Sequence, residues 1–212
     1  MRDRFLGIYT AALADILDAR GLREQTLPPS IRPLRPGTRL AGPAFTVSGR
    51  PAHPESYDAA LRKVLTMLGD VPAGHVAVYA CAQERAAHLG ELSVTSLKAR
   101  GVAGCVLDGG CRDVRFILDE GFPVFCGHIT PEDSTWRWEL EATQVPVTMG
   151  TVRIEPGDWV VGDDDGVVVV PHALAEGILA EAEEKAATES DIRAAVRDGA
   201  SPLDAYERYG TF

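Results

Sequence analysis

The sequence of 212 residues lacks several features that would assign it to a specialised class of protein. It has no run of about 18 apolar residues, so we expect no membrane-spanning helix. The N-terminal segment has no small-residue cleavage site after its apolar part, which argues against a secretory signal. Its cysteines are few and form neither a Cys-x-x-Cys pair nor a zinc-finger spacing: Cys81, Cys105, Cys111 and Cys126. We therefore expect a soluble cytoplasmic protein with reduced thiols.

Positive charge is also scarce. The chain has 21 Lys and Arg residues against 31 Asp and Glu residues, a net charge of −10. An acidic surface repels phosphate backbones, and no Lys/Arg run offers a local basic patch. Nucleic acid is therefore not an expected partner.

The spacing of apolar residues predicts an α/β protein. Helices are expected over residues 6–20, 57–69, 91–100, 113–120 and 173–198. Strands are expected over residues 44–48, 75–81, 103–107 and 123–126, followed by β segments at 145–152, 159–162 and 167–170. The strand–helix alternation between 75 and 126 is typical of a mostly parallel sheet. No repeat or linker interrupts the pattern, so a single domain over 1–212 is predicted.

Two stretches contain residues suited to chemistry. In the first, Gly90 precedes a helix that begins with Glu91, and the free amides of a helix start favour an anion. In the second, Asp108–Asp113, a Gly-rich turn places Arg112 and Asp113 after a strand, where open α/β sheets bind ligands. Backbone amides, one guanidinium and two carboxylates suit a small anion held on Mg²⁺.

Each of these residues also has a purely structural interpretation. Asp113 is a candidate helix N-cap worth about 1 kcal/mol. Glu91 in a first turn is favoured by the helix dipole. Arg112 is interpreted as a solvated surface charge and Gly109-Gly110 as a simple turn.

Two other features were weighed as ligand sites. Asp163-Asp164-Asp165-Gly166 lacks the alternating ligands and closing Glu of a calcium loop, so we interpret it as a hairpin turn. Among the 5 histidines, His88 alone is close enough in sequence to the proposed site to be considered part of it.

The spacing between the two stretches indicates a family. Twenty residues separate Glu91 from Arg112-Asp113, which resembles the acidic-x20-Arg-Asp signature of the class II pyruvate aldolases. These are the 4-hydroxy-4-methyl-2-oxoglutarate / 4-carboxy-4-hydroxy-2-oxoadipate aldolases, in a superfamily with the RraA regulators of ribonuclease E activity. The resemblance covers nearly the whole chain, through residues 14–18, 42–47, 98–104, 108–113, 121–125, 156–158 and 162–167.

The resemblance implies both a fold and roles for the site residues. The fold would be a layered β/β/α arrangement of the swivelling-domain type with a C-terminal helix. Asp113 would be the direct ligand of Mg²⁺ or Mn²⁺, and Arg112 would contact the pyruvyl oxygen. The substrate carboxylate would be held by backbone groups of four residues: Gly90, Glu91, Leu92 and Ser93.

The implied activity is a carbon–carbon lyase reaction. A 2-oxo acid such as 4-hydroxy-4-methyl-2-oxoglutarate would be cleaved to pyruvate, and oxaloacetate decarboxylated, through one pyruvate enolate stabilised by the metal and Arg112. A water oriented by Glu91 would move protons. The chain departs from its relatives at Glu91, where many have Asp, and at residues 80–84, where relatives often carry Asp and Gly.

One alternative function stays open. A non-catalytic RraA-type regulator that binds a ribonuclease or other protein shares the fold and can share the Arg-Asp pair. The resemblance also implies a homotrimer or hexamer. In such an assembly Glu189 of the C-terminal helix would reach a neighbour's metal site, whereas its structural interpretation is an i,i+4 pair with Lys185.

Overall fold

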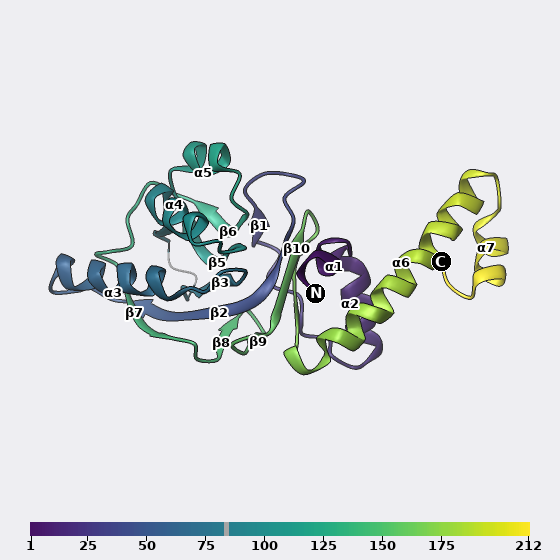
Figure 1. Cartoon of the computed structure of the whole chain (residues 1–212), viewed down its shortest axis with the longest axis horizontal. Coiled ribbons are helices and arrows are strands. Elements are labelled where there is room, and N and C mark those ends of the chain that lie inside the picture. The colour runs from purple at the N-terminus through teal and green to yellow at the C-terminus, as the bar shows by residue number, and fades with distance from the viewer. Residues whose placement is uncertain (83–84) are drawn as a thin grey trace.

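A large mixed sheet forms the centre of the computed structural model, which describes residues 1–82 and 85–212 (Figure 1). Along the hydrogen-bonded path its strands are β1 (Arg32–Pro33), β6 (Val124–Ile129), β5 (Gly104–Cys111), β3 (Val76–Ala80), β2 (Leu40–Pro51), β10 (Trp159–Asp163) and β11 (Gly166–Val170). Two further strands join it, β4 (Ala87–Leu89) beside β5 and β7 (Trp138–Thr143) beside β2. A separate hairpin pairs β8 (Val147–Met149) with β9 (Val152–Ile154).

The parallel part of the sheet positions the region of interest. Strands β2, β3, β5 and β6 run parallel in this order. The connections between them contain α3 (Tyr57–Asp70), α4 (Glu91–Ala99) and α5 (Val114–Glu120). Parallel strands joined by helices bring their carboxyl ends to one edge of the sheet. The predicted strand–helix alternation is confirmed.

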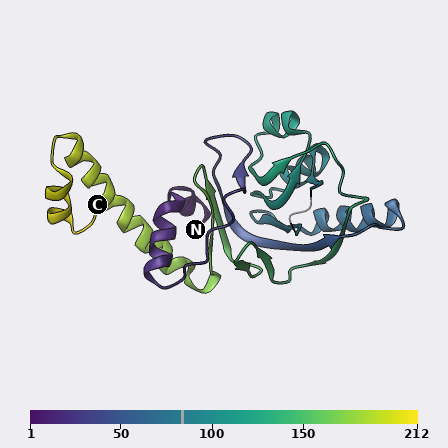
Figure 2. The same cartoon turned by 180° about the vertical axis from the view of Figure 1, so that it is seen from behind.

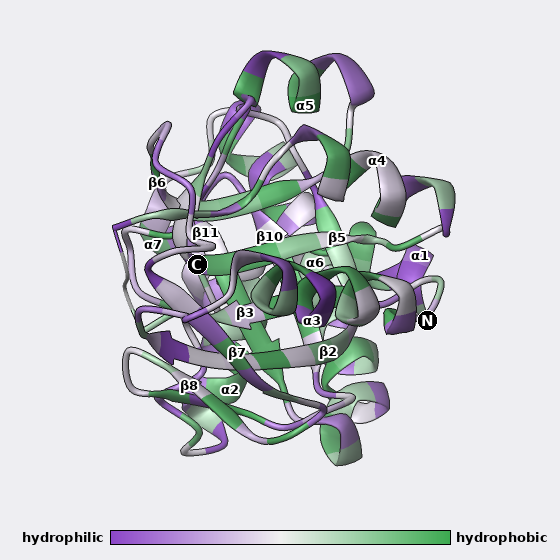
Figure 3. Ribbon diagram, turned by 90° about the vertical axis from the view of Figure 1, so that its left-hand side faces the viewer, coloured by the Kyte–Doolittle hydropathy of each residue, from purple (hydrophilic) through white to green (hydrophobic). Residues whose placement is uncertain are grey.

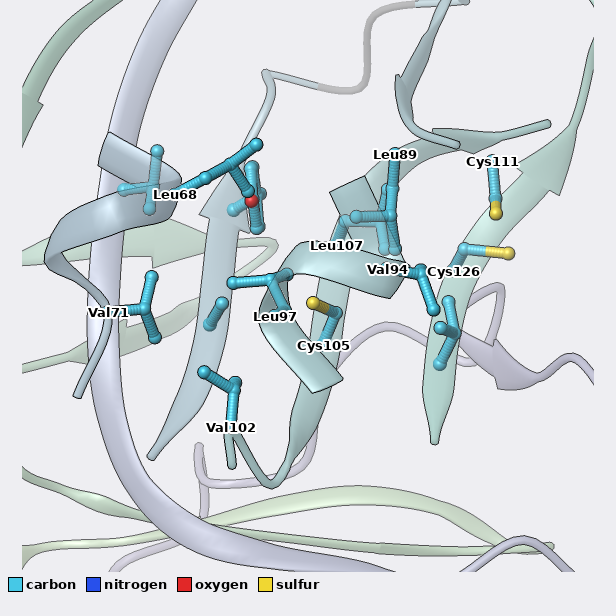
Figure 4. Packing of buried hydrophobic residues seen from close by; sticks show 14 of the residues in the cluster. Leu68, Val71, Leu89, Val94, Leu97, Val102, Cys105, Leu107, Cys111 and Cys126 are labelled. Atoms are coloured by element: carbon cyan, nitrogen blue, oxygen red, sulfur yellow. The ribbon is translucent and has the colours of Figure 1, made fainter. Parts of the chain in front are cut away.

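Helix α4 packs on the sheet through its buried face. Figure 4 shows Val94 and Leu97 of this helix beside Cys105 and Leu107 of β5. All four cysteines are buried. Burial raises the pKa of the Cys111 thiol to about 12, so at neutral pH this side chain stays protonated and acts as a small hydrophobic group. In Figure 3 the hydrophobic colour gathers on central strands such as β3 and β5.

The other end of the molecule is helical. Helices α1 (Arg2–Leu6), α2 (Thr10–Ala19) and α6 (Ala175–Arg197) share a buried cluster with β10 and β11, in which the Phe5 ring stacks on Trp159 at 4.8 Å. A 3-10 turn (His172–Leu174) precedes α6. The end of α6 and α7 (Pro202–Tyr209) extend away from the sheet (Figures 1 and 2). No helix in residues 1–82 and 85–212 is both long enough and apolar enough to cross a bilayer.

The fold class is as predicted: mixed α/β with a large mixed sheet and a long C-terminal helix. The single N-terminal helix expected over 6–20 is wrong, because the chain forms two helices. The Gly7 amide bonds the Arg4 carbonyl at 2.9 Å, and Tyr9 is extended at φ −88° and ψ 148°. The apolar stripe persists because both helices bury residues in the same cluster.

The turn expected at Asp108–Cys111 is also wrong, since β5 continues to Cys111. A Cβ on Gly109 would lie 2.5 Å from Nδ1 of His88, and one on Gly110 would lie 2.6 Å from the Ala86 carbonyl oxygen. The two glycines therefore allow neighbouring segments to approach a strand closely, rather than reversing the chain.

Candidate active site

A cavity of about 240 Å³ gathers both stretches singled out in the sequence. Strand β4 leads into α4 and pairs in parallel with the end of β5, so both segments reach the same edge of the sheet. The volume lies below the usual range for drug-sized ligands and suits a smaller molecule. The cavity lining includes all the predicted site residues: Gly90, Glu91, Leu92, Ser93, Arg112 and Asp113.

Asp113 occupies the N-cap position of α5, but its carboxylate does not cap that helix. Its backbone is left-handed, at φ 58° and ψ 32°, and no side-chain capping bond forms. Instead Oδ2 accepts a hydrogen bond from the Glu91 amide at 3.1 Å. A left-handed non-glycine residue costs roughly 1 kcal/mol and is typical of functional sites. The cap interpretation therefore does not account for this carboxylate.

The hydrogen bond between the Glu91 amide and Asp113 requires a glycine at position 90. A Cβ at this position would lie 2.6 Å from Oδ2 of Asp113 and 3.3 Å from Cγ of Arg112. Any side chain here would push the Arg-Asp pair away from the start of α4. Glycine at position 90 therefore brings the two stretches together.

Arg112 lies between two carboxylates. Its Nε is 3.7 Å from Oδ2 of Asp113, and its Nη1 is 3.5 Å from Oδ2 of Asp133. Both distances are long for hydrogen bonds, so the guanidinium is oriented but keeps N–H donors for a ligand.

Asp133 is a site residue that sequence reasoning missed. It follows β6, and its Oδ1 accepts hydrogen bonds from the Thr135 amide at 3.0 Å and hydroxyl at 2.9 Å. Burial alone would raise the pKa of this carboxyl, but the Thr135 donors and Arg112 outweigh it and the net pKa is lowered. The rule that singled out Arg112, a polar residue after a parallel strand, would also have found Asp133.

The first turn of α4 leaves polar groups without protein partners. Among the described residues, the Glu91 carboxylate and the amides of Leu92 and Ser93 make no hydrogen bond, while the Glu91 amide is taken by Asp113. Free amides at the start of a helix carry partial positive charge. This turn can therefore hold an anion beside a carboxylate that is available for proton transfer.

His88 lies deeper in the same cavity. It is 9% exposed, and neither ring nitrogen has a hydrogen-bond partner of good geometry among the described residues. Its ring meets Trp138 edge-on, with centroids 5.0 Å apart. Burial lowers the pKa of His88 to about 4, so the imidazole is neutral at pH 7.

Glu189 does not approach the cavity within one chain. It accepts a hydrogen bond from the Tyr9 hydroxyl, and Lys185 lies 4.0 Å away while bonding Asp15 at 2.6 Å. Figures 1 and 2 place α6 at the opposite end from α3 and α4. Its approach to a neighbouring chain stays a prediction.

The departure from relatives at residues 80–84 is only partly visible, since Gln83 and Glu84 lie outside the described residues. Upstream of them, the Cys81 amide donates to Oδ1 of buried Asp108 at 2.5 Å. Asp108 therefore links the end of β3 to β5.

Comparisons with known proteins identify the family of the chain. Residues 10–169 match the model of the RraA-like family, described as Aldolase/RraA. A protein of Halalkalibacterium halodurans, provisionally named 4-hydroxy-4-methyl-2-oxoglutarate aldolase, is 32% identical over 96% of this chain and 91% of its own length.

Solved structures share the fold of the chain. An uncharacterized protein from Pseudomonas syringae pv. tomato superposes with a TM-score of 0.83 at 31% identity, over 96% of this chain and 94% of that one. Streptomyces coelicolor RraAS2, described as an unusual member of the RNase ES inhibitor RraA family, superposes with a TM-score of 0.80 at 32% identity, over 90% and 94%. The chain therefore belongs to the RraA-like family.

Proposed function

We propose that this chain is a divalent-metal-dependent carbon–carbon lyase. It cleaves 2-oxo acids of the 4-hydroxy-4-methyl-2-oxoglutarate type to pyruvate and also decarboxylates oxaloacetate. The observation that carries the proposal is one cavity that combines Arg112, the unpartnered Glu91 carboxylate and the free amides of α4. The name of the Halalkalibacterium relative supports the reaction class.

The donor set fits Mg²⁺ or Mn²⁺, which would be held by Asp113 with Glu91 nearby. Mg²⁺ uses one or two protein carboxylates and keeps waters and substrate oxygens. In residues 1–82 and 85–212 no group of three or more His, Cys, Asp or Glu side chains is placed to hold a metal, which argues against a closed zinc site. When bound, the cation would supply a Lewis acid for the oxygens of the 2-oxo acid.

The protein residues then have distinct tasks. The amides of Leu92 and Ser93 bind the substrate carboxylate. Arg112, oriented by Asp133, donates to the oxygen on which enolate charge develops. Glu91 accepts the C4 hydroxyl proton, directly or through a water, and a proton returns to C3 of the enolate. Decarboxylation of oxaloacetate leaves the same enolate, so one site serves both reactions.

The direct test incubates the purified protein with oxaloacetate, with and without Mg²⁺, and follows pyruvate. Activity should disappear with EDTA and return with Mg²⁺ or Mn²⁺. Equal rates with and without metal, no higher than the protein-free blank, would contradict the proposal.

A protein-binding regulator is the second candidate, and the similarity to RraAS2 favours it. Such a protein would still bind a ribonuclease after its metal site had been abolished by mutation. A chain without pyruvate-forming activity under any divalent metal, but with saturable ribonuclease binding, would establish this alternative.

A homotrimer or hexamer is proposed as the working assembly. Large apolar side chains are exposed beside the cavity, where a neighbouring chain would cover them: Leu92, Phe116 and Ile129. Light scattering tests the assembly, and a monomer would contradict it.

Glu189 is proposed to serve a neighbour's site in that assembly. Asp113→Ala and Glu189→Ala subunits, each inactive alone, should regain activity when dissociated and reassembled together. Full activity of Glu189→Ala alone would remove Glu189 from the site.

A further inference from the structure

Two buried side chains in the wall of the cavity carry nitrogens that lack partners. His88 of β4 and Trp138 of β7 line the cavity and are 9% and 4% exposed. Among the described residues, neither ring nitrogen of His88 nor Nε1 of Trp138 has a hydrogen-bond partner of good geometry. Buried donors left unpaired destabilise a protein, so such groups usually have a water, an ion or a ligand as their partner.

Glycines of the sheet make room for both rings. A Cβ on Gly49 of β2 would collide with the Trp138 ring, and a Cβ on Gly109 of β5 would lie 2.5 Å from Nδ1 of His88. The two rings meet edge-on, with centroids 5.0 Å apart. Both polar rings are therefore held in the cavity wall by the sheet itself.

The Tyr79 hydroxyl adds a third polar group to this wall. Tyr79 lines the same cavity, is 2% exposed, and donates to the sulfur of Met67 at 3.7 Å, which is a weak acceptor. Burial raises the pKa of Tyr79 well above its usual value, so the phenol keeps its O–H. Tyr79, His88 and Trp138, here called the inner wall, therefore offer neutral donors to the cavity.

The inner wall belongs to one chain. Its three side chains are already buried within that chain, so a neighbouring chain could reach them only through the cavity. An ionised carboxylate suits such donors, because it has about four acceptor positions and forms stronger hydrogen bonds than a neutral acceptor. The χ2 torsions of His and Trp are soft, so a small turn of either ring aims its N–H at a bound group.

The inner wall lies within reach of the first turn of α4. His88 is three residues before Glu91 in the chain, which separates their Cα atoms by at most about 10 Å. The two carboxylate carbons of a five-carbon 2-oxo diacid are about 5 Å apart. A diacid whose first carboxylate is bound by the α4 amides can therefore extend its second carboxylate toward the inner wall.

We propose that the inner wall binds the second carboxylate of a dicarboxylic 2-oxo acid, with Trp138 and His88 as specificity-determining residues. The proposal rests on the proposed function for the substrate class and names the residues that recognise its second carboxylate. The carboxylate is bound by neutral N–H and O–H donors and does not need a cation at this place.

A pair of uncleaved ligands tests the proposal by titration calorimetry at saturating Mg²⁺. 2-Oxoglutarate and 2-oxopentanoate differ only in a terminal carboxylate against a methyl group. The wild-type protein should bind 2-oxoglutarate at least about tenfold more tightly, since hydrogen bonds to a charged group are strong. Equal affinities would overturn the proposal and would mean that the nitrogens of the inner wall bind only water.

Two tryptophan variants locate the preference. Trp138→Phe keeps an aromatic ring but deletes the N–H, and should reduce the preference for 2-oxoglutarate by about tenfold. Trp136→Phe makes the same change at a side chain that is 50% exposed and does not line the cavity, and should leave the preference unchanged. A preference that survives Trp138→Phe would place the second carboxylate elsewhere and overturn the proposal.

Two variants of His88 separate hydrogen bonding from packing. His88→Leu deletes the donor and should reduce the preference, whereas His88→Gln keeps an N–H and should retain most of it. Damage to packing weakens the binding of both oxo acids and leaves their ratio unchanged. Equal loss of the preference in both variants would remove His88 from the carboxylate site. If Trp138→Phe does not fold, the His88 variants decide.

These binding measurements are independent of bond cleavage, so they separate the proposal from the lyase function. If no 2-oxo acid yields pyruvate but Trp138→Phe still removes a 2-oxoglutarate preference, the lyase function fails and the carboxylate site stands. If pyruvate forms and the preference is absent or insensitive to Trp138→Phe, the carboxylate site alone is overturned.

Discussion

Carboxylates lie beside glycines in two regions of the molecule: the hairpin Asp163–Gly166, and the cavity that contains Glu91 and Asp113. The carboxylates of the two regions differ in what they bind. In the hairpin, Asp163 accepts from the Thr10 amide at 2.8 Å, the Thr10 hydroxyl at 2.6 Å and the Asp165 amide at 3.0 Å. Asp164 accepts from the Gly37 amide at 2.7 Å. These oxygens tie the hairpin to α2 and to the loop before β2.

In the cavity the same chemical groups are largely unsatisfied. Asp113 accepts one amide hydrogen bond, and Glu91 accepts none among the described residues. A carboxylate offers about four acceptor positions. Carboxylates whose acceptor positions are filled by protein donors stabilise the fold. Carboxylates with unfilled acceptor positions are available to a cation, a proton or a substrate.

The largest expected effect that tests this comparison is that of Asp113→Ala. Loss of the proposed metal ligand should reduce kcat by more than about 10³-fold. The free energy of unfolding should change by only about 1 kcal/mol, because the carboxylate makes one exposed hydrogen bond. Steady-state kinetics and urea denaturation measure the two quantities. Full activity would show that Asp113 binds no metal.

Arg112→Lys should have the next largest effect. Lysine keeps the charge but loses the planar fork of donors. If Arg112 faces the developing enolate oxygen, kcat should fall by roughly 10²–10³-fold. A change confined to KM would reduce Arg112 to a substrate-binding residue.

His88 extends the comparison to a buried side chain whose ring nitrogens have no hydrogen-bond partner of good geometry among the described residues. Its pKa of about 4 lies below the unfolded value of 6.5, so the unfolded chain binds more protons between these pH values. The free energy of unfolding should fall as pH drops from 6.5 to 4, by up to about 3 kcal/mol. His88→Leu should lack this part of the pH dependence. Parallel curves for the two proteins would mean that His88 is accessible to water in the folded state.

Asp163→Ala should give the smallest effect, on stability alone. The three groups that donate to Asp163 lose their acceptor, which should lower the free energy of unfolding by roughly 2 kcal/mol. The kcat per folded molecule should stay unchanged. Asp165→Ala is the matched control, since no hydrogen bond of its carboxylate is found in the described structure. Equal destabilisation by both variants would show that net charge, not bonding, matters in the hairpin.

The features predicted best from the sequence are those that depend on residues close together in the chain. Glycines 101 and 121 mark the ends of α4 and α5, where positive φ values of 76° and 64° favour glycine. The hairpin at Asp163–Gly166 is confirmed by the antiparallel pairing of β10 and β11. Both signals lie within a few residues of the structure they predict.

Features decided by distant contacts were missed. Trp138-Glu139-Leu140-Glu141-Ala142 alternates as a strand should, yet β7 depends on pairing with β2, roughly ninety residues earlier in the chain. Gly109 and Gly110 indicated a turn, but packing against His88 and Ala86 made them part of a strand. The acceptor role of Asp113 toward Glu91 likewise required the fold to be known.

Strand β2 is hydrogen-bonded to three others, with β3 on one edge and with β7 and β10 in its two halves. Strand β2 therefore joins the parallel strands β3, β5 and β6 to the antiparallel pair β10 and β11. Its central amides, near Val47, should therefore exchange with deuterated water only when the whole sheet unfolds. The parallel pairing of β2 with β3 must also close a loop that contains α3, so its formation should limit the folding rate.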